Sequence, residues 1–271
     1  MIAFPNCKIN IGLQIIGKRA DGYHDLQTIF YPVVLKDALE IIDNTETNDA
    51  AFSTTGITID GNAENNLCLK AYQLLKKDFP QLPGIKMHLH KTIPLGAGLG
   101  GGSADAAFTL QLLNKKYALG LDPESLNKYA ADLGSDCPFF LMNKPCFASG
   151  RGEILEEVTL DLSAWKILLI NPGIHINTGW AFSALEKMSI GSNLKEHVSQ
   201  PVATWREHIS NDFEIPVFKA HKEIASIKEN LYKTGAIYAA MSGSGSSLYG
   251  IFEKDAVPKL NFPSHYFQKW V

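Results

Sequence analysis

A dense run of glycines is the clearest sign of chemistry in this sequence. From Lys91 to Ala107 the chain reads KTIPLGAGLGGGSADAA, with five glycines among the seven residues 96–102. Glycine lets the backbone turn its N–H groups inward, and the run leads directly into a helix, for which we expect Ser103 as the N-cap. Bare amides and the positive end of a helix dipole both favour an anion. The spacing therefore predicts a phosphate-binding loop.

Two other interpretations of this loop compete with the first. Residues 96–101 also satisfy the dinucleotide pattern G-x-G-x-x-G, which is typical of an NAD-dependent oxidoreductase. That pattern needs an acidic residue about 20 positions later on the next strand, whereas Asp122 and Pro123 at that distance are typical of a helix start. The sequence contains no G-x-x-x-x-G-K-[ST] either, which excludes the ordinary P-loop. A glycine turn without a ligand remains the other alternative.

Three further groups of polar residues accompany the loop. Lys8 and Asn10 fall on one face of an apolar strand, where a lysine needs an anionic partner unless it lies at the surface. Tyr23 and His24 lie in a turn that is either solvated or suited to stacking on a planar base and hydrogen bonding to it. Asp136 follows a Gly-Ser pair and precedes Cys-Pro, so it is either a helix cap or a general base.

The elements that position these residues can be predicted from hydrophobic periodicity. Strands are expected at residues 9–15, 35–42, 57–60, 86–90 and 165–170, with a further strand pair joined by residues 241–246. Helices are expected at 67–79, from the glycine loop to Tyr117, from Pro123 to a stop at Gly134, and through Ile224 and Leu231 to Gly235. A loop at 149–153 and a polar, irregular segment at 189–210 complete the pattern, and we place a domain boundary near residue 160.

Composition limits the class of protein. With 271 residues and 45% hydrophobic content, the chain can bury a sizeable core. No apolar run approaches the roughly 20 residues of a membrane span and the N-terminus lacks a signal-peptide pattern, so we expect a cytoplasmic protein. A net charge of -3 disfavours nucleic-acid binding. The four cysteines, which have no C-x-x-C spacing, are expected to be reduced and mostly buried: Cys7, Cys68, Cys137 and Cys146.

Taken together, these motifs resemble those of the GHMP kinase superfamily. The resemblance rests on KIN at 8–10, GKRADGYH at 17–24, PLGAGLGGGSADAA at 94–107, LGSDCPFF at 133–140 and MSGSGSS at 241–247. It implies a two-domain α+β GHMP kinase fold. Residues 1–160 would form an N-terminal ATP-binding domain similar to the second domain of ribosomal protein S5. Residues 161–271 would form a ferredoxin-like C-terminal domain on the substrate side, with the active site between the two.

The resemblance also implies a reaction. The glycine block is typical of the whole superfamily, and the RADGYH segment is typical of one kinase within it. That kinase uses ATP and Mg²⁺ to phosphorylate the 2-hydroxyl of 4-diphosphocytidyl-2-C-methyl-D-erythritol in the non-mevalonate pathway of isoprenoid biosynthesis. Another GHMP kinase, acting on homoserine or mevalonate, and an inactive binding protein of the same fold are the alternatives. Retention of Lys8 and Asp136 disfavours the inactive protein, and the pair Tyr23 and His24 disfavours the other kinases.

Site residues are implied by position in the matching motifs. Lys8 and Asp136 match the catalytic pair, in which the aspartate accepts the hydroxyl proton. The ATP-binding positions are Asn66, Lys91, Pro94, Gly96, Ala97, Gly98, Leu99, Gly100, Gly101, Gly102 and Ser103. The Ser103 hydroxyl is also the expected protein ligand of Mg²⁺. The substrate-binding positions are Asn10, Tyr23, His24, Thr178, Gly243, Ser244 and Gly245, with Tyr23 stacked on the cytosine and His24 hydrogen-bonded to its edge.

Overall fold

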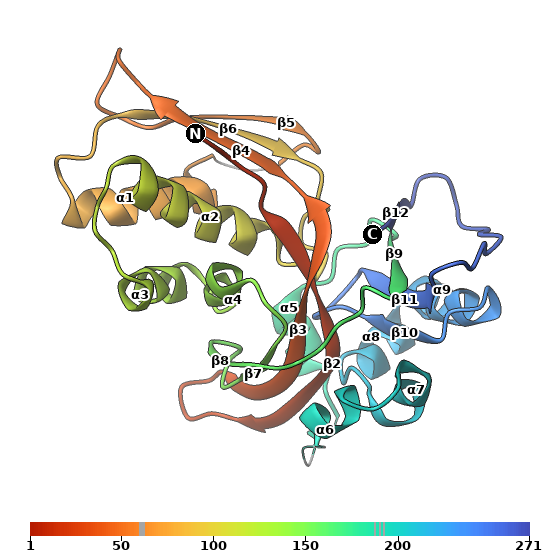
Figure 1. Ribbon diagram of the computed structural model, residues 1–271. Helices are drawn as coiled ribbons and strands as arrows, with labels where there is room; N and C mark the ends of the chain where they lie inside the picture. The colour runs from red at the N-terminus through yellow and green to blue at the C-terminus, as the bar shows by residue number, and fades with distance from the viewer. Residues whose placement is uncertain (60–62, 187, 190, 192) are drawn as a thin grey trace. The chain divides into compact units, whose positions relative to one another are not determined.

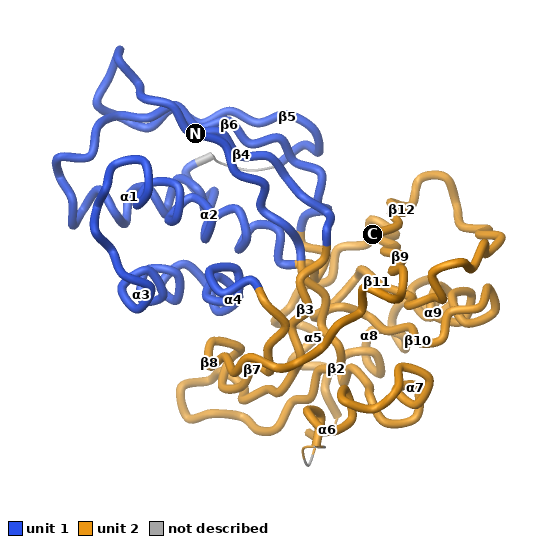
Figure 2. The backbone as a smooth tube through the Cα atoms, in the orientation of Figure 1, with its two compact units in different colours: residues 1–7, 34–95, 100–143 blue, residues 8–33, 96–99, 144–271 orange. Residues whose placement is uncertain are grey.

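The computed structural model describes residues 1–59, 63–186, 188, 189, 191 and 193–271 (Figure 1). These residues form two compact units, each made of segments that are distant in the sequence (Figure 2). Unit 1 contains residues 1–7, 34–95 and 100–143, and unit 2 contains residues 8–33, 96–99 and 144–271. The glycine-rich loop is therefore divided between the units after Leu99. The predicted division into family domains near residue 160 stays a prediction.

Unit 1 contains a four-stranded sheet with helices on one face (Figure 1). The strand order is β1 (Ile2–Ala3), β4 (Ala38–Asp43), β6 (Ile85–Lys91) and β5 (Ala51–Gly56). β6 pairs antiparallel with β4 and parallel with β5. The helical elements are η1 (Ala63–Asn65), α1 (Leu67–Asp78), α2 (Gly101–Lys116), α3 (Pro123–Leu133) and α4 (Cys137–Met142). The core between sheet and helices includes Ile41, Leu75, Met87, Leu110 and Leu113, all at most 1% exposed.

The start of α2 corrects one prediction. Gly100, not Ser103, is the N-cap, and it has a φ of 69° in the left-handed region. A left-handed residue turns the chain into the helix at little cost only when it is glycine. Ser103 consequently lies inside the first turn, where its hydroxyl is not used as the cap. By contrast, α3 begins and ends as predicted, because the Asp122 side chain accepts a hydrogen bond from Ser125 N and Gly134 closes the helix.

Most of the other two sheets is in unit 2, although one end of two strands belongs to unit 1. One has the order β2 (Asn6–Lys18), β3 (His24–Lys36), β7 (Cys146–Ser149) and β8 (Ile154–Glu157). The other is antiparallel, in the order β10 (Tyr238–Met241), β11 (Leu248–Glu253), β9 (Trp165–Asn171) and β12 (Phe267–Trp270). The helical elements are α5 (Thr178–Ser183), α6 (Leu194–Val198), η2 (Val202–Thr204), α7 (Trp205–His208), α8 (Glu214–Ala220) and α9 (Lys222–Lys233).

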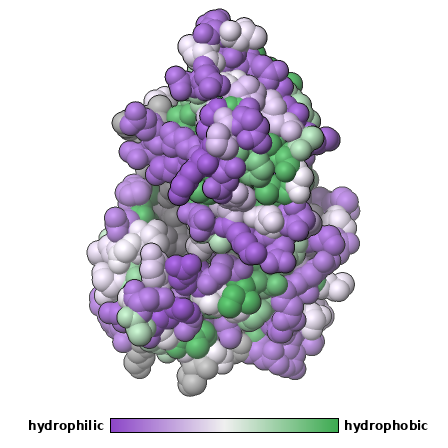
Figure 3. Space-filling view, turned by 90° about the vertical axis from the view of Figure 1, so that its left-hand side faces the viewer, coloured by the Kyte–Doolittle hydropathy of each residue, from purple (hydrophilic) through white to green (hydrophobic). Residues whose placement is uncertain are grey.

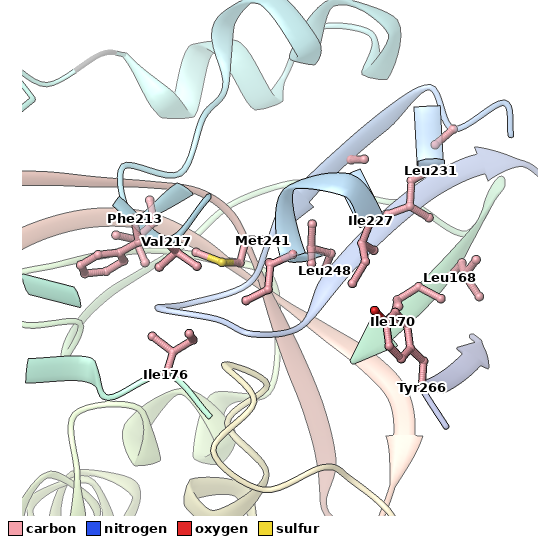
Figure 4. Close-up of a cluster of buried hydrophobic side chains, with 14 of the residues drawn as sticks. Leu168, Ile170, Ile176, Phe213, Val217, Ile227, Leu231, Met241, Leu248 and Tyr266 are labelled. Carbon is pink, nitrogen blue, oxygen red and sulfur yellow. The ribbon is translucent and has the colours of Figure 1, made fainter. Parts of the chain in front are cut away.

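The core of unit 2 joins the antiparallel sheet to α8 and α9 (Figure 4). Leu168 and Ile170 of β9 and Leu248 of β11 are fully buried there, against Ile227 and Leu231 of α9. The strand at 165–170, the helix through Ile227 and the strand pair around 241–246 are therefore confirmed. A buried face of this kind excludes water from one side of the sheet and leaves its loops to carry polar residues.

Three predicted segments differ from the structure. Residues 35–42 are not one strand: β3 ends at Lys36 and β4 begins at Ala38, in different sheets. The chain turns there because the Asp37 carboxylate binds the backbone N–H groups of Thr92 and Ile93. The strand expected at 57–60 lies earlier, as β5, and Asp60 is outside the described residues. The segment 189–210, of which 190 and 192 are outside the described residues, contains α6, η2 and α7 instead of irregular chain.

The surface agrees with the composition. The face of the molecule drawn in Figure 3 is mainly hydrophilic, with small separate groups of hydrophobic residues. Within the described residues, no helix combines the length and the apolar character that crossing a bilayer requires. All four cysteines are buried, as predicted.

Candidate active site

The glycine loop has the backbone that its sequence predicts. Gly96, Gly98 and Gly100 have φ values of 57°, 77° and 69°, all in the left-handed region that other residues rarely adopt. In unit 1 the loop runs straight into the N-terminus of α2, whose first amides point toward any bound anion. Alternation of left-handed glycines with ordinary residues is suited to placing several N–H groups on one concave side.

At two of the glycines, close packing leaves no room for a Cβ atom, whereas at a third there is room for one. A Cβ atom on Gly98 would collide with the carbonyl oxygen of Ser242. A Cβ atom on Gly101 would lie 2.8 Å from Ile93 Cγ2. On exposed Gly102 the nearest atom would be Leu67 Cδ1, 3.9 Å away. The first two positions need glycine for packing, whereas a Cβ atom on Gly102 would meet no atom closer than ordinary van der Waals contact.

In unit 2, hydrogen bonds to Asn10 and Gly98 orient the ammonium group of Lys8. Lys8 lies on β2 and is 3% exposed. Its Nζ donates to Asn10 Oδ1 at 2.6 Å and to the carbonyl oxygen of Gly98 at 3.1 Å, and it lies 4.9 Å from the centroid of the Phe30 ring. The lysine is therefore held against the glycine loop, and the alternative of a surface lysine is wrong.

Two hydroxyl groups complete this network, and motif matching assigned neither of them a role. Ser242 Oγ donates to the carbonyl oxygen of Gly98 at 2.8 Å and accepts from Asn10 N at 3.2 Å. Thr28 Oγ1 accepts from Asn10 Nδ2 at 3.0 Å, which leaves the amide oxygen of Asn10 directed at Lys8. Ser242 is part of the MSGSGSS segment, so its position was visible in the sequence, but its partners were not.

The β10–β11 hairpin brings the third motif to the same loop. Ser247 N donates to the carbonyl oxygen of Ala97 at 3.1 Å, so the hairpin is bonded to the glycine loop. Between its strands, Gly243 and Gly245 have φ values of 58° and 98°. The Ser244 hydroxyl lies 3.0 Å from the hydroxyl of Thr178 at the start of α5. Two positions predicted separately to bind substrate therefore contact each other in unit 2.

The turn that carries Tyr23 and His24 presents two different rings. Tyr23 is 57% exposed, and the guanidinium group of Arg151 lies 4.9 Å from its ring centroid. His24, at the start of β3, stacks on Phe182 of α5 with centroids 4.6 Å apart and planes 16° apart. Arg151 and Phe182 were not among the site residues predicted from the sequence. Both contacts join segments distant in the sequence, so no local spacing could indicate them.

In unit 1, Lys91 lies under the glycine loop in a buried cluster of charges. It is 1% exposed, and its Nζ forms ion pairs with Asp37 and, at 2.7 Å, with Asp105 of α2. Burial lowers the pKa of Lys91, but the two carboxylates outweigh that effect and raise it above its usual value. Burial is also the largest influence on Asp105 and raises the pKa of its carboxyl group to about 7.

The Lys91 cluster connects both ends of the loop. Asp37 accepts hydrogen bonds from Thr92 N at 2.6 Å and Ile93 N at 2.9 Å, on the segment that enters the loop, while Asp105 lies on the helix that follows it. These contacts explain how β6 and α2 are fixed relative to one another. The predicted adenosine contact of Lys91 stays a prediction.

Asp136 lies beside the first turn of α2 within unit 1. It occupies the N-cap position of α4, yet its side chain makes no capping hydrogen bond, so a capping role does not explain this aspartate. The Ser103 side chain lies near the thiol of the next residue, Cys137. Burial raises the pKa of the Cys137 thiol to about 12, and the charge of Asp136 acts in the same direction. Ser103 and Asp136 are thus both near the Cys137 thiol.

Asn66 and Pro94, which are also predicted to bind ATP, are in unit 1. Asn66 is the N-cap of α1 and accepts a hydrogen bond from Cys68 N, and its neighbour Leu67 is the residue nearest to the open side of Gly102. Pro94 is half-buried on the entry to the loop. Within the described ranges, no group of three or more His, Cys, Asp or Glu residues is arranged to hold a metal ion. A single hydroxyl such as that of Ser103 fits Mg²⁺ as a partial ligand, because Mg²⁺ takes most of its ligands from phosphates and water.

The family descriptions and the known proteins that match this chain agree with one another. The family description "GHMP kinases N terminal domain" matches residues 66–144, and "GHMP kinases C terminal" matches residues 193–260. Over 270 residues the chain is 49% identical to the 4-diphosphocytidyl-2-C-methyl-D-erythritol kinase of Bacteroides thetaiotaomicron, covering 98% of both chains. It is 50% identical over 264 residues to the kinase of the same name from Bacteroides fragilis, covering 97% of this chain and 96% of the relative.

Solved structures give the same family. A crystal structure of 4-(cytidine 5'-diphospho)-2C-methyl-D-erythritol kinase matches with a TM-score of 0.81 and 30% identity, covering 93% of this chain and 90% of that one. The homoserine kinase of Cytophaga hutchinsonii matches with a TM-score of 0.62 and 14% identity, covering 93% of this chain and 86% of that one. The second likeness shows a shared fold alone.

Proposed function

Because the chain belongs to the GHMP kinase family, among the 4-diphosphocytidyl-2-C-methyl-D-erythritol kinases, we propose that it transfers the γ-phosphoryl group of ATP to the 2-hydroxyl of 4-diphosphocytidyl-2-C-methyl-D-erythritol. The observation that carries this proposal is the 49% identity over 98% of the chain. The predicted two-domain α+β GHMP kinase fold is confirmed. The reaction belongs to isoprenoid precursor biosynthesis, and we place it in the cytoplasm as the sequence predicts.

The nucleotide side of the site is supported by the geometry of the loop. The left-handed glycines and the open N-terminus of α2 provide amide donors for the phosphates of ATP, and exposed Gly102 leaves space there. Ser103 would hold Mg²⁺ together with the phosphate oxygens, and the ion would supply charge neutralisation. The ion pairs of Lys91 support a positioning role for that residue, since they fix the strand before the loop to the helix after it.

The transfer step is assigned to Lys8 and Asp136. Phosphoryl transfer depends on positioning and on electrostatic stabilisation more than on covalent participation by the protein. In the proposed mechanism, the Asp136 carboxylate accepts the proton of the acceptor hydroxyl as the oxygen attacks the γ-phosphorus. The Lys8 ammonium group, oriented by Asn10 and Gly98, keeps that carboxylate ionised and stabilises charge on the transferring oxygens.

The acceptor side is assigned to residues of unit 2. Tyr23 presents an exposed ring for stacking, and His24 offers ring nitrogens to the edge of the cytosine. Phe182, which stacks on His24, belongs to the same group of aromatic residues. Thr178 and Ser244, which contact each other, and the glycines on either side of Ser244 are proposed to contact the polar part of the acceptor, as is Asn10.

A coupled assay of ADP release tests this function. The purified protein is supplied with ATP and Mg²⁺, and 4-diphosphocytidyl-2-C-methyl-D-erythritol is compared with homoserine, mevalonate and galactose. Turnover with the cytidyl substrate alone is expected. Turnover with one of the other alcohols would retain a GHMP kinase but remove the acceptor assignment, and absence of turnover with all four would overturn the proposed reaction.

A further inference from the structure

An arginine that the motifs do not include lies against the ring proposed to receive the base. Arg151, in the turn between β7 and β8, has its guanidinium group 4.9 Å from the centroid of the Tyr23 ring. A guanidinium group over an aromatic face is attracted to the negative face of the ring's quadrupole. The phenol ring has two faces and is 57% exposed. With Arg151 over one face, the base can approach only the other.

Contacts within unit 2 hold the arginine in this position. Leu26 N donates to the carbonyl oxygen of Gly150 at 2.8 Å, which joins the strand after Tyr23 to the turn that carries Arg151. Glu153 accepts a hydrogen bond from Arg151 N at 2.6 Å, and its carboxylate lies 3.6 Å from Arg151 Nε. The guanidinium group is therefore anchored on its own turn, and its place over Tyr23 does not depend on a flexible side chain alone.

The backbone of Tyr23 is fixed by hydrogen bonds within its own turn. Arg19 N donates to the carbonyl oxygen of Tyr23 at 2.8 Å, and Asp21 Oδ1 accepts from Tyr23 N at 3.0 Å. Backbone and ring are thus restrained by different groups. Restraint before binding lowers the entropy lost when a ligand stacks on the ring.

We propose that Arg151 is a specificity-determining residue of the acceptor site, where guanidinium group, Tyr23 ring and the cytosine of the substrate form a three-layer stack. This inference rests on the proposed function, because the cytidine group is the ligand. The guanidinium group holds the phenol ring in one orientation, and its planar shape fits a stack in a way that an ammonium group does not. A base that binds on the open face then finds a preformed platform.

The variants Arg151→Met and Arg151→Lys test this stack. The chain offers a matched control in Arg206, whose guanidinium group lies 4.1 Å from the ring of Tyr232, away from the proposed site residues. Kinetics with ATP and the cytidyl substrate are combined with calorimetric binding of free cytidine and of CDP. We expect the KM for the cytidyl substrate and both dissociation constants to rise about 3- to 10-fold in Arg151→Met, as for loss of one cation–π contact.

The remaining measurements distinguish a role in binding the base from a general loss of folding or activity. The KM for ATP and kcat are expected to stay within about 2-fold, and Arg206→Met should behave as the wild type. Arg151→Lys should recover only part of the affinity, since a lysine keeps the charge but not the plane. In a Tyr23→Leu background, Arg151→Met should cause no further loss of cytidine or CDP binding, because the ring through which it acts is gone.

Several results would overturn the inference. Unchanged binding of both cytidine and CDP in Arg151→Met would do so, as would an effect that persists in the Tyr23→Leu background. Weaker binding of CDP with unchanged binding of cytidine would mean that Arg151 contacts the phosphates instead. A wild-type protein that binds cytidine and CDP but does not turn over the cytidyl substrate would contradict the proposed function while leaving the stack open to the same binding test. Failure of the wild type to bind either would overturn both.

Discussion

Each unit of the protein buries a lysine beside the glycine loop, and the two lysines contact different parts of the fold. Lys91 in unit 1 is 1% exposed and is held by the carboxylates of Asp37 and Asp105. Lys8 in unit 2 is 3% exposed and donates hydrogen bonds to Asn10 Oδ1 and to the carbonyl oxygen of Gly98. Lys91 is therefore paired with acidic side chains of its own unit, whereas Lys8 is directed at the glycine loop.

The difference separates a structural lysine from a chemical one. Carboxylates cancel the charge of a buried ammonium group, so removal of either side leaves an uncompensated charge and costs stability. The hydrogen bonds of Lys8 to Asn10 and Gly98 direct its ammonium group at the glycine loop. We propose that the charge of Lys91 serves the connection of β6 to α2, and that the charge of Lys8 serves the reacting groups. Both residues are lysines, and the groups that each one contacts determine its role.

The largest expected effect is on folding, in Lys91→Met. The variant leaves Asp37 and Asp105 buried without their cation, and breaking a buried ion pair from one side costs about 3–5 kcal/mol. The urea midpoint should fall accordingly, measured by circular dichroism at neutral pH. Lys8→Met is the matched control, since it replaces a buried lysine of the same size in the other unit. A loss of stability as large in Lys8→Met would remove the distinction between the two sites.

The next effect is on catalysis, in Lys8→Met and Asp136→Asn. Each removes a group that acts in the transition state, so kcat should fall at least ~100-fold. The KM for ATP should change little in Asp136→Asn, because that residue is not assigned to nucleotide binding. Steady-state kinetics in the ADP-release assay give both numbers. Near-normal turnover in Asp136→Asn would exclude this residue as the general base, and near-normal turnover in Lys8→Met would place its charge outside the reaction.

A smaller effect is expected from Ser242→Ala. The substitution removes the hydroxyl that bonds the Gly98 carbonyl oxygen and the Asn10 N–H, both of which lie next to Lys8. Loss of such a buried bond costs about 1–2 kcal/mol, which corresponds to a decrease in kcat/KM of about 5- to 30-fold. Thr234→Ala is the control, because the Thr234 hydroxyl also donates to a carbonyl oxygen, that of Asn230, in a helix of the same unit. Equal losses in both variants would show that Ser242 acts on stability and not on Lys8.

Some parts of the fold could be predicted from the sequence and others could not. The helix α3 was predicted to the residue because its signals are local: Asp122 caps it, Pro123 opens it and Gly134 ends it. The break at Asp37 could not be predicted, because it comes from bonds to Thr92 and Ile93 more than 50 positions away. Alternation of apolar residues carries no information on such a contact.

The strand β5 and the contacts of Ser242 also could not be predicted from local sequence patterns. Ala51–Gly56 is an edge strand with mostly exposed residues, so it lacks the apolar alternation by which strands are recognised. Motif resemblance indicated Lys8 and the glycine loop, since both are written in short segments. The contacts of Ser242 with Gly98 join residues 144 positions apart, and only the folded chain places them together.

The smallest expected effect is a pH dependence of stability that comes from the Lys91 cluster. Burial raises the pKa of Asp105 to about 7 in the folded protein, above the ordinary value of 3.8. Between those values the folded state holds more protons than the unfolded state, so the free energy of unfolding decreases as pH rises. The raised pKa of Lys91 acts only at high pH, where the lysine loses its proton.

Urea unfolding of the wild type and Asp105→Asn at pH 6 and pH 7.5 measures this effect. The contribution of Asp105 should decrease by about 1 kcal/mol over that interval, and the variant, which has no carboxyl group there, should lack the decrease. A difference between the two proteins that stays constant with pH would mean that Asp105 is ionised throughout, with Lys91 compensating for its burial and for the neighbouring charge of Asp37.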